Sequence, residues 1–172
     1  MNTLTATKKG IISGIVLMAV SLVMFYGLKL PENGMSQYVV LGLFIAAVLW
    51  SLFSFKKTAP VNATFKSYFA EGFKTFIVIT FFMVIFTFVF YKFNPQILEN
   101  AITENNALIL KEGNRTEAEI NANADKLRNI FMPMMLSITT VKFLILGALI
   151  SVVGGGFLSQ NAGRYAAHNP QR

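Results

Sequence analysis

The sequence contains no cysteine, and its one histidine is His168, near the end of the chain. Without cysteine, a disulfide, a thiolate metal site, an iron–sulfur cluster and a cysteine nucleophile are all excluded. One histidine also excludes a multi-histidine metal site within a single chain. No other group of residues matches a known catalytic constellation. We therefore expect no metal, no cofactor and no enzymatic activity.

Charged residues are also scarce. They make up 13% of the 172 residues, and 54% are apolar, whereas a soluble domain usually carries about a quarter charged residues. Long stretches without charge are typical of a chain that faces lipid. In a soluble protein the net charge of +7 would suggest nucleic acid. Here the basic residues flank apolar segments, so we expect membrane lipids as partners and no nucleic acid.

Four apolar segments are long enough to cross a bilayer as helices, which takes about 20 residues each. None of them shows the period-2 alternation of a barrel strand. The predicted helices cover residues 10–30, 38–55, 73–92 and 132–158. The sequence thus predicts an all-α membrane protein with four transmembrane helices, organised as a single membrane domain over residues 1–172.

Two short connections precede the third helix. The segment Pro31 to Gly34 has the composition of a tight turn. The segment from Lys56 to Lys74 carries aromatic residues at helical spacing, interleaved with charged residues. It forms either a separate amphipathic helix in the membrane interface or an extension of the third helix into the headgroups. The sequence leaves these two alternatives open.

The connection between the third and fourth helices, residues 94–131, is the largest polar segment. Asn94-Pro95 has the pattern of a helix start, and Gly113 that of a helix end. Thr116 and Glu119 match a capping box for a second helix. We therefore predict a helical hairpin insertion, whose second arm merges into the fourth helix with a bend near Pro133.

Flanking charge predicts the orientation, because cytoplasmic loops carry an excess of lysine and arginine. One side has a single acid, Glu71, and eight basic residues: Lys8, Lys9, Lys56, Lys57, Lys66, Lys74, Arg164 and Arg172. The other side has seven acids and six basic residues: Lys29, Lys92, Lys111, Arg115, Lys126 and Arg128. We expect both termini in the cytoplasm and the hairpin outside it.

Lys142 is the one ionisable residue inside a predicted span, and Thr139 and Thr140 lie one turn or less before it. An ionisable residue in a membrane helix is a candidate functional site. Lys142 lies only about one turn inside the span, so its ammonium can instead extend to the outer headgroups. The remaining alternatives are binding of an anionic ligand or lipid, and transport. The predicted spans contain no acid that would pair with it.

Gly147, Ser151 and Gly155 recur at every fourth residue and form a stripe of small residues on the fourth helix. Such stripes allow two helices to approach closely. The stripe is either a packing seam within the chain, the reading we favour, or a seam between copies in a homo-oligomer.

The order of these features resembles a known family. The quoted segments are Ala63-Thr64-Phe65-Lys66-Ser67-Tyr68-Phe69-Ala70-Glu71-Gly72-Phe73-Lys74, then Tyr91-Lys92-Phe93-Asn94-Pro95, then Gly147-Ala148-Leu149-Ile150-Ser151. Together with the basic start and the acidic helical insert, they resemble the four-helix membrane proteins of Bacteroidota, domain of unknown function family 4199. The resemblance implies the inner membrane of a Gram-negative bacterium. It implies no activity and no catalytic residue.

These observations favour a non-enzymatic accessory or interaction protein of the inner membrane, which presents a periplasmic helical hairpin to a protein partner. The alternative is a small oligomeric transporter or channel. Its lining would come from the few polar residues of the spans: Ser21, Thr80, Thr87 and Lys142.

Overall fold

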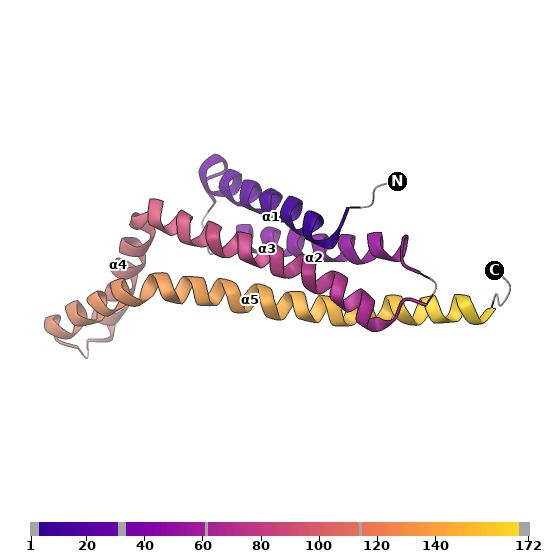
Figure 1. Ribbon diagram of the computed structural model, residues 1–172. Helices are drawn as coiled ribbons and strands as arrows, with labels where there is room; N and C mark the ends of the chain where they lie inside the picture. Colours follow the sequence, from indigo (N-terminus) through magenta and orange to yellow (C-terminus); the bar gives the residue numbers. More distant parts are fainter. Residues whose placement is uncertain (1–3, 31–33, 61, 114, 169–172) are drawn as a thin grey trace. The chain divides into compact units, whose positions relative to one another are not determined.

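The computed structural model describes residues 4–30, 34–60, 62–113 and 115–168 (Figure 1). These residues form helices and no strand: α1 (Ala6–Leu22), the π-helical η1 (Val23–Gly27), α2 (Met35–Lys56), α3 (Phe65–Phe93), α4 (Pro95–Glu112) and α5 (Glu117–His168). Four helical segments are long and apolar enough to cross a membrane: Ala6–Gly27, Met35–Thr58, Phe65–Phe93 and Glu117–Gln160. The prediction of an all-α membrane protein with four such helices is confirmed.

The chain divides into two compact units. Unit 1 comprises Met1–Met83 and Val141–Arg172, and unit 2 comprises Val84–Thr140. Unit 1 therefore holds α1, η1, α2 and one part each of α3 and α5, whereas unit 2 holds α4 and the remaining parts. The sequence predicts one domain, because the apolar patterns of α3 and α5 continue without a break through the boundaries of the units.

Three helices of unit 1 begin earlier than the apolar pattern predicts. Thr5 caps α1, accepting a hydrogen bond from the Lys8 amide at 3.3 Å, so the helix includes residues that the sequence assigns to a polar flank. Helix α2 begins at Met35, after a predicted tight turn whose residues 31–33 lie outside the described residues. Helix α3 runs unbroken from Phe65. The extension of the third helix, the second of the two alternatives, is therefore observed.

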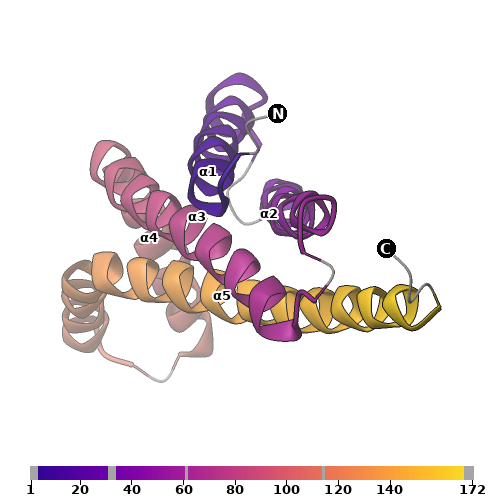
Figure 2. The same cartoon turned by 45° about the vertical axis from the view of Figure 1, so that its right-hand side comes forward.

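Helix α1 packs closely on α3, because its glycines leave room for the neighbouring helix. A Cβ added at Gly10 would lie 2.8 Å from Cβ of Val78, and one added at Gly14 would lie 2.9 Å from Cβ of Phe82. Real side chains do not approach that closely, so these two positions need glycine. Helix α1 also packs along α2 (Figure 2).

In unit 2 the local signals of the sequence mark the helix ends. Pro95 is the first residue of α4, and Gly113, with φ of 68°, ends it in the left-handed conformation that favours glycine. The Thr116 amide donates to a Glu119 carboxylate oxygen at 2.8 Å, and the Glu119 amide donates to the Thr116 hydroxyl at 3.4 Å. This reciprocal pair is the predicted capping box. Helix α5 continues from it through Pro133 and carries on as the fourth membrane-length helix.

Candidate functional site

A buried ion pair joins α1 and α3 in unit 1. Lys9 Nζ lies 3.0 Å from Glu71 Oε1, and the two side chains are only 5% and 15% exposed. Lys9 also donates to the backbone carbonyl of Ser51 on α2 at 3.4 Å. Burying a charge is costly unless it is paired and hydrogen-bonded. Each charge therefore depends on the other, and the pair fixes three helices relative to one another.

Two hydroxyl groups extend this pair. Ser51 Oγ lies 3.3 Å from Glu71 Oε1 and donates to it. Thr75 Oγ1 lies 2.7 Å from Ser51 Oγ, 3.0 Å from the Glu71 carbonyl and 3.4 Å from the Ala6 carbonyl, so its single proton is shared among three acceptors. Ser51 and Thr75 are both fully buried. Lys9, Ser51, Glu71 and Thr75, here called the Lys9 cluster, form a neutral network of charged and hydroxyl groups.

The Lys9 cluster corrects one expectation from the sequence. Lys142 is not the only ionisable residue within the spans, because α1 and α3 begin early enough to include Lys9 and Glu71 in membrane-length helices. Two features of the sequence distinguish Glu71 from the other acids. It is the only acid between Glu32 and Glu99, and it precedes Thr75 by one helical turn at the start of an apolar segment.

The small-residue stripe of α5 faces α3 of the same chain in unit 1. A Cβ added at Gly147 would lie 2.4 Å from Cγ of Phe76, and one added at Gly155 would lie 3.3 Å from a backbone nitrogen of α3. Ser151 is fully buried against Gly72, whose added Cβ would lie 2.5 Å from Ser151 Oγ. The stripe therefore forms close contacts within one chain. Ser151 Oγ has no hydrogen-bond partner among the described residues.

The predicted polar site around Lys142 is divided between the units. In unit 1, Lys142 is half-buried, and its Nζ lies over the Phe143 ring, 5.6 Å from the centroid. In unit 2, the Thr140 hydroxyl donates to the Leu136 carbonyl at 2.7 Å, and Thr139 Oγ1 lies 3.3 Å from the hydroxyl of a threonine on α3, Thr87. Both threonine hydroxyls therefore bond within their own unit.

In unit 2, an arginine fork joins α4 to the first turns of α5. Arg128 Nε and Nη2 lie 3.1 and 2.9 Å from the two carboxylate oxygens of Glu99, and Nη1 lies 3.1 Å from Asp125. These hydrogen bonds from Arg128 lower the pKa of Glu99. The pair is exposed, so screening by solvent leaves it a small contribution to stability. Its two-point geometry nevertheless fixes the register of the two helices.

The last turn of α4 carries two exposed leucines. Leu108 and Leu110 are 58% and 64% exposed, on either side of the half-buried Ile109. By contrast, Ile102 earlier on α4 and Ile120 in the first turn of α5 are buried, at 4% and 6% exposed. The last turn of α4 therefore presents apolar surface that unit 2 itself does not cover.

Among the described residues, no three histidine, cysteine, aspartate or glutamate side chains are grouped so that they could hold a metal ion. The features described above that carry exposed or buried polar groups are the Lys9 cluster in unit 1 and the Glu99–Arg128 contact in unit 2.

Comparison with known proteins identifies the family. The model of the family described as protein of unknown function (DUF4199) matches residues 8–160. That range is most of the chain, so the chain belongs to this family, as the resemblance predicts. No curated protein and no solved structure matches it.

Proposed function

We propose that this member of the DUF4199 family is a non-enzymatic accessory protein of the bacterial inner membrane. Both termini lie in the cytoplasm, and a helical hairpin, residues 94–131, contacts a protein partner in the periplasm. The orientation rests on the excess of lysine and arginine around the chain ends and the second connection. A reporter active only outside the cytoplasm, fused at Gly113, should give signal, and the same reporter fused at Arg172 should not. The reverse pattern would invert the topology.

The observation that carries the proposal is the apolar end of α4. Leu108 and Leu110 are exposed in the last turn of α4, and the Glu99–Arg128 contact joins α4 to the early part of α5. Hydrophobic residues at the centre of a contact, surrounded by polar groups, are typical of protein interfaces.

Photo-crosslinking in native membranes tests the partner. A photoreactive amino acid is placed at Leu108, and as a matched control at Lys126, which is exposed on the other arm. The proposal expects one defined protein crosslinked from Leu108 and not from Lys126, with the adduct lost when Leu110 is changed to glutamate. Adducts with lipid alone, or only with a second copy of this chain, would refute an accessory role.

A small oligomeric transporter or channel is the second candidate, and the Lys9 cluster is the observation in its favour. Ionisable residues within membrane helices often mark ion or substrate pathways. Against it, Ser21 and Thr80 do not offer free hydroxyls, because each donates to a carbonyl of its own helix at 2.8 Å. Ion or proton flux in proteoliposomes that is abolished by Glu71→Gln would support transport. Flux equal to that of empty liposomes would exclude it for the ions tested.

A further inference from the structure

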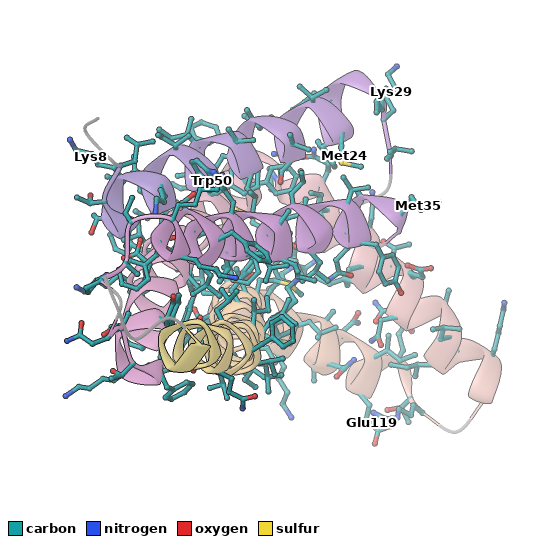
Figure 3. All side chains as sticks on the ribbon, turned by 90° about the vertical axis from the view of Figure 1, so that its right-hand side faces the viewer. Lys8, Met24, Lys29, Met35, Trp50 and Glu119 are labelled. Carbon is teal, nitrogen blue, oxygen red and sulfur yellow. The ribbon has the colours of Figure 1, made fainter. Side chains whose placement is uncertain are left out.

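One end of unit 1 carries five exposed lysines. This end is where α1 begins, α2 ends and α3 begins. Figure 3 shows Lys8 there, with Lys29 and Met35 at the opposite end of the same unit. Its exposed basic residues, here called the lysine rim, are Lys8, Lys56, Lys57, Lys66 and Lys74.

The contacts of the Lys9 cluster place the rim lysines at similar levels. Lys8 is adjacent to Lys9 in the sequence. Lys56 and Lys57, the last residue of α2 and the residue after it, follow Ser51 by five and six residues. On α3, Lys66 precedes Glu71 by five residues and Lys74 follows it by three. At about 1.5 Å per residue, none is more than about 9 Å along its helix from the cluster. Lysine side chains are long and flexible enough to bring their ammonium groups to a common plane over that range.

No acid among the described residues of this end offsets the lysine rim. Its one acid is Glu71, whose carboxylate is 15% exposed and bound by Lys9 inside the bundle. The two charges cancel within the Lys9 cluster. The sequence shows an excess of basic residues here. The structure adds that, among the described residues of this end, the exposed charged side chains are all lysines.

Aromatic side chains accompany the rim. Phe65, Phe69 and Phe73 line successive turns of α3 with ring centroids 5.9 Å apart in each pair, and the first and third are 43% and 44% exposed. Trp50, next to Ser51, is 43% exposed (Figure 3). Aromatic rings alternating with lysines at the end of a membrane helix are typical of the headgroup level of a bilayer.

We infer that the lysine rim binds the headgroups of anionic phospholipids. Lipid phosphates lie at the ends of membrane-spanning helices, which is where these lysines project. The exposed rings beside them favour a lipid interface over nucleic acid or an acidic protein, because such rings are stable among acyl chains and headgroups but not in water. The rim therefore favours lipids with a net negative headgroup over zwitterionic ones. This inference does not depend on the hairpin or its partner.

Lipid competition on the full-length protein tests the inference. The protein is purified in a neutral detergent and mixed with equal amounts of phosphatidylglycerol and phosphatidylcholine that have the same acyl chains, and bound lipids are counted by native mass spectrometry. We expect phosphatidylglycerol to be enriched about fivefold or more, because a single lysine near an anionic surface already contributes on that order. The variant K56Q/K57Q/K66Q/K74Q, which keeps only Lys8 of the rim, should lose most of this enrichment.

A matched control separates the lysine rim from net charge. The variant K29Q/K92Q/K111Q/K126Q removes the same charge from residues outside the rim and should keep the enrichment. Circular dichroism reports whether both variants retain their helix content, and a rim variant with arginine in place of lysine should bind like the wild type. Equal binding of the two lipids by the wild type, or equal loss of enrichment in both glutamine variants, would overturn the inference.

Discussion

Replacing Glu71 with glutamine tests whether the Lys9 cluster stabilises the protein as a charge pair. The amide keeps the size of the side chain and can still accept a hydrogen bond from Lys9. It removes the negative charge, so that Lys9 is left with a full charge and a 5% exposed side chain. Removing Lys9 instead, as Lys9→Met, leaves the Glu71 side chain unpaired, and that side chain is more exposed, at 15%.

The magnitude follows from the burial of the pair. Removing one partner of a buried ion pair costs about 3–5 kcal/mol. Because the glutamine still accepts from Lys9, we expect Glu71→Gln to lower the free energy of unfolding by about 3 kcal/mol, at the lower end of that range. Lys9→Met should cost less. The double variant should recover most of the loss, because replacing both partners removes the unpaired charge and is often close to neutral.

Thermal unfolding in one detergent, followed by circular dichroism, measures these differences. For a chain of this length, about 3 kcal/mol corresponds to a fall in Tm of about 6–12 °C. Lys8→Met is the matched control, since Lys8 is exposed on the same turn of α1, and its effect should stay within about 0.5 kcal/mol. If the losses of Glu71→Gln and Lys9→Met simply add in the double variant, the two groups are not coupled and the reasoning fails.

Two further predictions concern helix packing and pH. Gly147→Ala should lower the free energy of unfolding by about 1–3 kcal/mol, because the added Cβ would lie 2.4 Å from a ring carbon of the buried Phe76. Gly156→Ala is the control, since nothing lies within 4 Å of its added Cβ, and a loss as large in the control would contradict the packing argument. The protection of α4 amides against hydrogen exchange, corrected for the intrinsic pH dependence of the exchange rate, should decrease as pH falls below the usual range of glutamate. The pKa of Glu99 is lowered by its hydrogen bonds from Arg128, so this stabilisation is present above the unfolded pKa and lost as pH falls through the folded one. In Glu99→Gln that pH-dependent part should disappear; if it persists, another group is responsible.

Features with a local cause were predictable from the sequence. Pro95 and Gly113 mark the ends of α4, and Thr116 with Glu119 marks the start of α5, because each depends on a few neighbouring residues and the backbone conformation they favour. The four membrane-length helices were predictable for a similar reason, since the length of an apolar segment is read directly against the thickness of a bilayer.

The Lys9 cluster was not predictable, because it depends on contacts between distant segments. Lys9 and Glu71 are 62 residues apart, and each lies just outside an apolar segment, where a charge normally marks the end of a span. The two residues become part of membrane-length helices only because α1 and α3 begin earlier than the apolar segments do. The division of Lys142 from Thr139 and Thr140 has a related cause: residues adjacent in sequence belong to different compact units, and no local pattern marks that boundary.

The Lys9 cluster also bears on topology. It joins the first turn of α1, the last turns of α2 and the start of α3, so these three helix ends lie at one end of unit 1. Ser151 packs on Gly72, the residue after Glu71, which brings the later part of α5 to the same end. An inverted α1 would separate Lys9 from Glu71, and it would also move Lys8 away from the other rim lysines. The burial of one charge pair and the distribution of exposed lysines therefore favour the same direction of α1 relative to α2 and α3, for different physical reasons. A variant that breaks the pair but keeps the rim can separate their contributions.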